Sequence, residues 1–296
     1  MYRRRKLVTK RTRRKRFTLV PERNLPGAPL FAPFYRGLTV PRYAVASSKL
    51  SNKEPIRAVL LSDLHNYIYG DDQQPLIRQI RELKPDVIFL AGDMADDRVP
   101  FMGLALLLAG IENLAPCYYV AGNHDYWSGQ IDEVKKAVAS HGVTVLEGQT
   151  VNAVLKGQQV SISGLDDPVM IPAREGEGRA DAYRRALETF ADINTEKYNI
   201  LVAHRPEFIK DYRRYGFDLV LSGHAHGGQV RIPFLLNGLY APNQGFFPKY
   251  AGGLYDLDGT KLLVSRGLSY NPALPRIFNP PEVVLLEIQG TGEGQA

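Results

Sequence analysis

The chain has one cysteine, Cys117, among its 296 residues. A single cysteine cannot form an intramolecular disulfide, so a fold held together by disulfides is excluded. Cys117 lies in the apolar run 117–120. A cysteine in such a run is typically a buried structural residue rather than a reactive thiol.

The sequence also lacks an apolar run long enough to cross a bilayer. A spanning helix needs about 20 apolar residues, and the stretch 28–34 is short and rich in proline. No apolar segment of adequate length follows the basic residues at the N-terminus, so we expect no signal peptide. These absences predict a protein that is cytoplasmic or peripherally associated with a membrane.

Acidic residues are missing from residues 1–16, which hold ten lysines and arginines. The whole chain has 37 basic and 31 acidic residues, so the remainder has 27 against 31 and is mildly acidic. So much charge with so few apolar residues is typical of a disordered tail. Its charge suits an anionic membrane or cell-wall surface, with nucleic acid less favoured. A solvated tail without a partner fits equally well.

We divide the chain into a basic tail with a proline-rich arm, residues 1–37, and one domain, residues 38–290. With 44% hydrophobic residues, the chain can bury a full core. Short apolar runs indicate strands buried on both faces, at 58–62, 86–91, 117–121 and 199–203. Helices are expected between them, at 75–84, 99–113, 130–141, 179–190 and 206–214. This alternation of strands and helices predicts an α/β layered fold.

The pattern changes between residues 143 and 164. Three short strands follow one another closely at 143–146, 151–155 and 160–163, which indicates hairpin connections and a second sheet. Further strands are expected at 218–222, 228–232, 261–265 and 283–288.

Five of the six histidines lie in short motifs. Each motif follows the carboxyl end of a predicted strand, where ligands gather in open α/β sheets. Residues that are far apart in the sequence should therefore meet in space. The motifs are Asp63-Leu-His65, Gly92-Asp93, Gly122-Asn-His-Asp125, Ala203-His-Arg205 and Gly223-His-Ala-His226.

Carboxylate and imidazole ligands without thiolate suit Mn, Fe, Zn or Mg. One carboxylate can bridge two such cations about 3.5–4 Å apart, and a water held between them becomes hydroxide near neutral pH. The cations also stabilise the charge on phosphoryl oxygens in the transition state. The leading hypothesis is therefore metal-assisted hydrolysis of a phosphate ester.

The motifs, in this order, resemble those of the calcineurin-like metallophosphoesterases. Segments 203–207, 223–229, 241–245 and 265–268 resemble the bacterial branch typified by YkuE- and YaeI-like phosphodiesterases. The resemblance covers roughly residues 40–288. It implies a four-layer α/β fold, in which a β-sandwich of two mixed sheets is flanked by α-helices and the metals lie at one edge.

The resemblance also implies roles for individual residues. His124 would contact the scissile phosphate and protonate the leaving oxygen, and Asp96 would orient His124. Two divalent ions would be bound by Asp63, His65 and His226 at the first site, by Asn123, His204 and His224 at the second, and by Asp93 at both. Apart from the resemblance, the chemistry of Arg205 and Arg266 suits binding of a second phosphate or a distal group, because arginine forks suit phosphate. Surface or structural ion pairs explain these two arginines equally well.

The site itself does not separate monoesters from diesters. The resemblance favours a phosphodiesterase or pyrophosphatase that acts on a small or lipid-linked phosphoester. One alternative is a phosphomonoesterase for proteins or small molecules. Another is a non-catalytic binding protein anchored by its tail.

Overall fold

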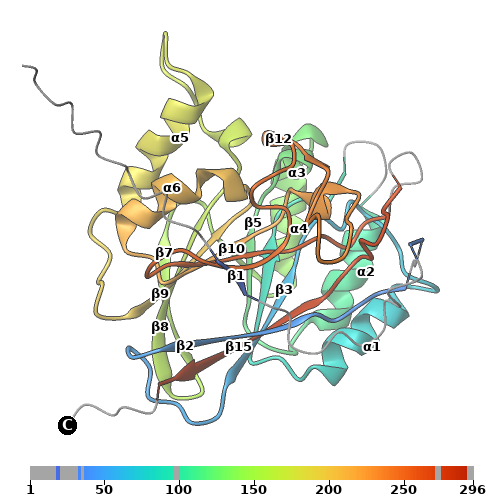
Figure 1. The fold of residues 1–296 in the computed structure, drawn as a ribbon, viewed down its shortest axis with the longest axis horizontal. Helices are drawn as coiled ribbons and strands as arrows, with labels where there is room; N and C mark the ends of the chain where they lie inside the picture. The colour runs from blue at the N-terminus through green and yellow to red at the C-terminus, as the bar shows by residue number, and fades with distance from the viewer. Residues whose placement is uncertain (1–17, 21–32, 35–36, 97–100, 271–274, 292–296) are drawn as a thin grey trace, which may run out of the picture.

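The computed structural model describes residues 18–20, 33–34, 37–96, 101–270 and 275–291. Two β-sheets lie at the centre, with helices α1 and α2 on one side and α5 and α6 on the other (Figure 1). This is the four-layer α/β arrangement that the motifs imply. The predicted basic tail, and most of the proline-rich arm, lie outside the described residues.

The first sheet has six strands in the order β2-β15-β3-β4-β5-β6. Strands β3, β4 and β5 are parallel neighbours, so their carboxyl ends lie along one edge. Strand β15 is antiparallel to β3 and parallel to β2. The strands are β2 (Arg42–Ser47), β3 (Ile56–Leu61), β4 (Val87–Ala91), β5 (Cys117–Val120), β6 (Thr144–Val145) and β15 (Val284–Gly290).

The second sheet has seven strands in the order β1-β13-β14-β10-β9-β8-β7. Strands β14, β10, β9 and β8 run parallel, and β7 forms an antiparallel hairpin with β8. The strands are β1 (Thr18–Val20), β7 (Thr150–Leu155), β8 (Gln158–Leu165), β9 (Tyr198–Ala203), β10 (Leu219–Ser222), β13 (Gly253–Asp256) and β14 (Lys261–Val264). A separate small hairpin joins β11 (Tyr240–Ala241) to β12 (Gly245–Phe246).

The helices cover the outer faces of the sheets. Helix α1 buries Leu76, Ile77 and Ile80 along one side, which is the pattern of an amphipathic helix. The α-helices are α1 (Gln74–Glu82), α2 (Met102–Ile111), α3 (Asn123–Trp127), α4 (Ile131–Ser140), α5 (Arg179–Leu187) and α6 (Ile209–Tyr212). Short 3₁₀ turns are η1 (Pro168–Met170), η2 (Glu188–Phe190), η3 (Pro206–Phe208), η4 (Arg213–Tyr215) and η5 (His226–Gly228).

Three apolar clusters hold the layers together. Leu60 and Phe89 from the first sheet share the central cluster with Ile200 and Leu221 from the second. The other two clusters lie between each sheet and its helices. The central strands are therefore buried on both faces, which explains why they read as continuous apolar runs in the sequence.

Three sequence expectations differ from the structure. The run 143–146 contributes β6, which pairs in parallel with β5 in the first sheet rather than joining the second. The strand expected at 228–232 was wrong, because only isolated bridges form at Val230 and Ile232. Within the arm predicted to lie outside the domain, β1 forms an edge strand beside β13. Pairing with distant strands decided the positions of β6 and β1, and local sequence does not encode such pairing.

Candidate metal centre

The five motifs converge at one place. The loops after β3 and β4 are joined by a hydrogen bond from Asp63 N to Gly92 O (3.0 Å) and another from His65 N to Asp93 O (3.0 Å). In the second sheet, the loops after β9 and β10 are joined by Gly223 N to His204 O (3.0 Å). Carboxyl ends of strands from both sheets thus meet at one site, as the positions of the motifs predicted.

Several of these motif residues have a left-handed backbone, which is uncommon for residues other than glycine. The φ angles are 52° for Asp63, 47° for His65, 54° for Asp93, 66° for His224 and 47° for His226. Such conformations cost free energy and persist where the surrounding structure enforces them, commonly at functional sites. The hydrogen bonds between the loops provide that enforcement here.

A first group of donor atoms comprises Asp63, His65 and His226, which lie within 4.8 Å of one another. His226 Nε2 is 3.3 Å from Asp63 Oδ1 and 3.3 Å from His65 Nε2. Two imidazole nitrogens that face each other beside a carboxylate form a donor set that suits a divalent cation.

A second group comprises Asp93, His204 and His224, again within 4.8 Å. His204 Nε2 lies 3.1 Å from Asp93 Oδ2, and His65 Nε2 from the first group lies 3.9 Å from the same oxygen. Asp93 therefore lies between the two groups. The buried oxygen Asn123 Oδ1 has no hydrogen-bond partner among the described residues, so it is available as a ligand.

The histidines are oriented by their second ring nitrogens. His204 Nδ1 lies 2.7 Å from the carbonyl oxygen of Ala91, and His65 Nδ1 lies 2.9 Å from Asp96 Oδ2. Each contact fixes the proton on Nδ1 and leaves the Nε2 lone pair facing the site, as in metal-binding histidines. His224 Nε2 is 2.8 Å from Asn243 Oδ1, which fixes its proton on Nε2 and leaves Nδ1 as the donor.

Burial keeps two of the histidines neutral. It lowers the pKa of His224 to about 3, assisted by the nearby His204, and lowers the pKa of His226 well below its ordinary value. For His204, burial is outweighed by the charge of Asp93, and the pKa rises to about 10. The negative charge of Asp93 that raises this pKa equally favours a cation at this position, because metal and proton compete for the same lone pair.

His124 and Asp96 have a different geometry from the one expected. Asp96 Oδ2 is 3.8 Å from His124 Nδ1, longer than a hydrogen bond, and pairs with His65 instead. His124 is half-buried at the start of α3, and its backbone N–H donates to Asp93 Oδ1 (2.7 Å). Its ring packs edge-on against Trp127 with 5.0 Å between ring centroids. Asp96 is placed to orient His65 directly, and the orienting of His124 stays a prediction.

Asp125, the last residue of the Gly122-Asn-His-Asp125 motif, has a structural role. Its buried carboxylate accepts hydrogen bonds from the backbone N–H groups of Asp93 (2.8 Å), Ala95 (2.7 Å) and Gly122 (2.8 Å). It thereby joins the loop after β4 to the loop after β5. Burial raises the pKa of Asp125 to about 7. Its place directly after the Gly-Asn-His motif was the only sequence signal for this role.

Two motif glycines are required by close packing. A Cβ atom on Gly122 would lie 2.2 Å from Asp93 Oδ1, and one on Gly223 would lie 2.5 Å from Asp63 Oδ2. Both distances are far inside van der Waals contact. Only glycine lets the backbone approach these carboxylates.

The two arginines expected to bind substrate are placed differently from each other. Arg205 lines the pocket at the site, but its guanidinium forms a two-point ion pair with Asp167 (2.6 and 2.9 Å). Arg266 is 3% exposed, pairs with the buried Glu282 (2.8 Å) and is not among the pocket-lining residues. The structure therefore supports a structural ion pair for Arg266 rather than a substrate contact.

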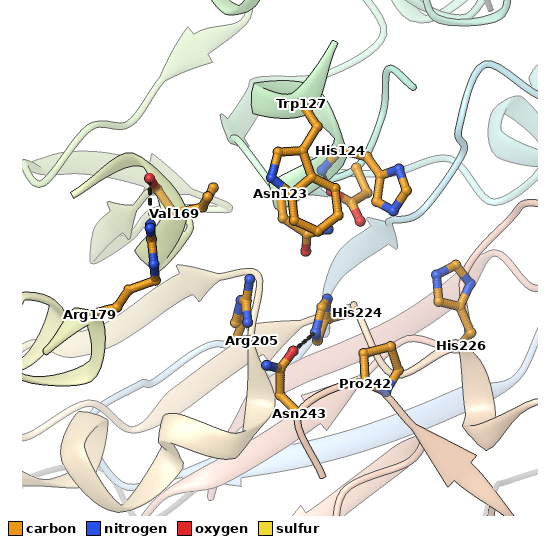
Figure 2. Close-up of a pocket in the computed structure, with 11 residues that line it drawn as sticks. Asn123, His124, Trp127, Val169, Arg179, Arg205, His224, His226, Pro242 and Asn243 are labelled. Atoms are coloured by element: carbon orange, nitrogen blue, oxygen red, sulfur yellow. Dashed lines mark hydrogen bonds between the residues drawn. The ribbon is translucent and has the colours of Figure 1, made fainter. Parts of the chain in front are cut away.

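A pocket of about 520 Å³ opens onto these residues. Figure 2 shows His124 and Trp127 on one side and His224, His226 and Asn243 on the other. Arg179 lines the far end, where its Nη1 donates to the carbonyl oxygens of residues 168 and 169 (3.3 and 2.8 Å). No motif pointed to Arg179, and Asn243 was marked only by its place in segment 241–245, which carries part of the family resemblance.

Residues 56–228 match the family model described as calcineurin-like phosphoesterase. The chain belongs to this family. The phosphoesterase is therefore a hydrolase of phosphoester bonds, and the resemblance of its motifs to the family is confirmed. Members use divalent metal ions, and the two donor groups are the candidate sites.

Curated relatives support the assignment. The phosphoesterase is 31% identical over 268 residues to an uncharacterised metallophosphoesterase of Campylobacter jejuni, covering 88% of this chain and 67% of the relative. It is 29% identical over 266 residues to one of Aquifex aeolicus, covering 86% and 93%. It is also 28% identical over 243 residues to YkuE of Bacillus subtilis, covering 79% of each chain. In the part of the chain that the structure describes, no helix has the length and apolar character needed to cross a membrane.

Proposed function

We propose that the phosphoesterase hydrolyses phosphodiesters or pyrophosphates with two divalent metal ions, identified only as Mn, Fe, Zn or Mg. Asp63, His65 and His226 would hold the first ion, and Asn123, His204 and His224 would hold the second. The single observation that carries this proposal is the position of Asp93. Its Oδ2 lies 3.1 Å from a histidine of one donor group and 3.9 Å from a histidine of the other, which suits a shared ligand.

Bound divalent cations would supply the positive charge that stabilises phosphoryl oxygens and activates the attacking water. The protein contributes ligand orientation: Asp96 and the carbonyl of Ala91 fix the tautomers of His65 and His204. These outer contacts raise ligand basicity and keep the rings aimed at the site.

His124 is the residue that we assign to the leaving group. It lines the pocket from the first turn of α3, and its backbone N–H donates a hydrogen bond to Asp93 Oδ1. Its ring is held against Trp127. A proton passed from this ring to the departing oxygen would complete the hydrolysis.

The preference for a diester or pyrophosphate is supported by the charge along the pocket. Arg205 is neutralised by Asp167 and adds little for a dianionic monoester. Space continues past the donor groups to Arg179 at the far end of the pocket. A substrate with groups on both sides of phosphorus fits this shape, and a small or lipid-linked phosphoester is the class that we propose.

The test compares hydrolysis of bis-p-nitrophenyl phosphate with that of p-nitrophenyl phosphate, with Mn²⁺ added or with a chelator. Diester turnover should exceed monoester turnover and should disappear on chelation. His124→Ala should keep its metal but lose about 10²–10⁴-fold in rate, the usual contribution of a general acid.

The matched control is His141→Ala. His141 lies outside the donor groups and contacts Glu112 at 3.3 Å, so this variant should keep wild-type rates. Faster turnover of the monoester would replace the proposed diesterase by a phosphomonoesterase. The proposal would be contradicted if metal-loaded protein hydrolysed neither compound faster than buffer without protein.

A further inference from the structure

Large apolar side chains are exposed on two adjoining segments near the pocket. Phe234 is 99% exposed, Leu235 81%, Phe246 71% and Phe247 69%. A soluble surface seldom presents such large side chains together, and contiguous apolar patches commonly mark interaction sites. We call these residues, with the partly exposed Ile232 and Tyr240, the apolar loops.

The backbone of the apolar loops is held in a defined conformation. The loop that carries Phe234 is closed by two hydrogen bonds between the backbones of Ile232 and Leu236 (2.9 and 2.8 Å). Phe234 and Phe247 have φ angles of 65° and 55°, which bulky side chains rarely adopt. The fold therefore holds these phenyl rings outward against a local conformational cost, as is common at functional surfaces.

Backbone hydrogen bonds join the two segments. Leu239 N donates to the carbonyl oxygens of Gly228 and Val230 (3.0 and 2.9 Å), and Phe247 N donates to Leu239 O (2.7 Å). Tyr240 and Phe246 pair across the β11–β12 hairpin, with their ring centroids 5.3 Å apart. The loop and the hairpin thus form one continuous support for the exposed side chains.

The same hairpin forms a wall of the catalytic pocket. Its turn contains Pro242 and Asn243, which line the pocket, and Asn243 contacts His224 (Figure 2). Helix α3 carries the half-exposed Trp127, which lines the same pocket from the other side (Figure 2). Whatever covers the apolar loops is therefore adjacent to the pocket mouth.

The charged residues in the same part of the sequence indicate what kind of surface would cover the apolar loops. Residues 219–255 contain no aspartate or glutamate, and Arg231 and Lys249 are their only lysine or arginine residues. Elsewhere in the sequence, residues 1–16 hold ten further lysines and arginines and no acidic residue. Exposed aromatic side chains accompanied by lysine and arginine, with acids absent, suit the interface of an anionic bilayer.

We propose that the apolar loops insert into the surface of an anionic lipid bilayer and place the pocket against it. If the proposed phosphodiesterase activity holds, its substrate is then a phosphoester carried by a membrane lipid. The binding part of this inference stands on the loops and their charge, and the substrate part rests on the proposed function.

The experiment uses the full chain in flotation with vesicles of phosphatidylcholine, with or without phosphatidylglycerol. The test variant is Phe234→Asn with Leu235→Ser, because asparagine tolerates a left-handed backbone and both side chains are exposed. The control is Val154→Thr, which changes an apolar side chain that is 69% exposed on β7. The Val154→Thr control should unfold at the wild-type temperature, and the test variant at that temperature or slightly above it, because asparagine relieves the backbone cost at position 234 and no buried contact is changed.

Wild type should float with the phosphatidylglycerol vesicles, and some binding should survive in about 0.5 M salt, where electrostatic attraction is screened. In that salt the test variant should bind about tenfold more weakly or worse, because two large apolar side chains no longer leave water. The Val154→Thr control should bind like wild type. All three should hydrolyse the water-soluble diester equally.

Equal vesicle binding by the test variant and wild type would overturn the inference. The inference would also be overturned if wild type did not bind vesicles but self-associated in sedimentation through the apolar loops. A second copy of the chain would then cover them. Failure of the proposed function is read separately: wild type would float with vesicles yet hydrolyse no diester. Hydrolysis of the water-soluble diester without vesicle binding would leave the function standing and reject the docking surface.

Discussion

Asp125→Asn tests how the loops that carry the proposed ligands are held in place. The carboxylate of Asp125 accepts from Asp93 N and Gly122 N through Oδ2 and from Ala95 N through Oδ1. Asparagine has nearly the same shape but only one acceptor oxygen. If that oxygen keeps the two bonds on the Oδ2 side, the amide nitrogen faces the N–H of Ala95, and two donors meet without an acceptor.

The expected cost follows from these contacts. Each buried donor left without a partner costs about 1–3 kcal/mol. For two such donors we take the lower part of the summed cost. The substitution also removes a buried negative charge close to that of Asp93, and this repulsion contributes to the raised pKa of Asp125. The free energy of unfolding should fall by about 2–3 kcal/mol, two orphaned donors at the lower end of that cost.

Urea unfolding of the metal-free protein measures this loss without interference from bound metal. The control Asp192→Asn makes the same chemical change at an exposed residue and should stay within about 0.5 kcal/mol of wild type. An Asp125→Asn variant with the same midpoint and slope as wild type would refute the role that we assign to these three hydrogen bonds.

Further predictions concern the supports of the site. Asp96→Ala removes the contact that orients His65, and metal affinity measured by calorimetry should fall about 10–100-fold; unchanged affinity would remove Asp96 from this role. Gly122→Ala would place a Cβ 2.2 Å from Asp93 Oδ1 and should destabilise the protein by about 1–3 kcal/mol in urea unfolding, whereas Gly178→Ala, whose Cβ has 3.5 Å of clearance, should change little. Mn²⁺ at about 100 times its dissociation constant should stabilise the metal-free protein by about 2.7 kcal/mol, and a melting temperature that ignores added metal would contradict the assignment.

The sequence predicted the parts of the fold that depend on burial. Strands β3, β4, β5 and β9 are covered on both faces, so apolar residues dominate each of them. Because the motifs follow these strands directly, their convergence could be predicted as well. The edge strand β2 has an alternating, half-buried pattern and was not recognised.

The finer structure of the site depends on contacts between distant segments. Several contacts at the site join separate loops. They are the pairing of Asp96 with His65, the ion pair of Arg266 with Glu282, and the three hydrogen bonds to Asp125. Nothing in a local sequence window specifies them. The left-handed backbone at the motif residues is likewise enforced by tertiary hydrogen bonds and opposes local preference.

The central claim is that Asp93 serves two metal ions, and metal stoichiometry tests it most directly. The protein is loaded with Mn²⁺, freed of unbound metal by gel filtration and assayed by elemental analysis, together with Asp93→Asn and the control His141→Ala. The account predicts two ions per chain for wild type and the control, and less than one for Asp93→Asn, because both sites lose a ligand together. Two ions per chain in Asp93→Asn, or only one in wild type, would contradict it.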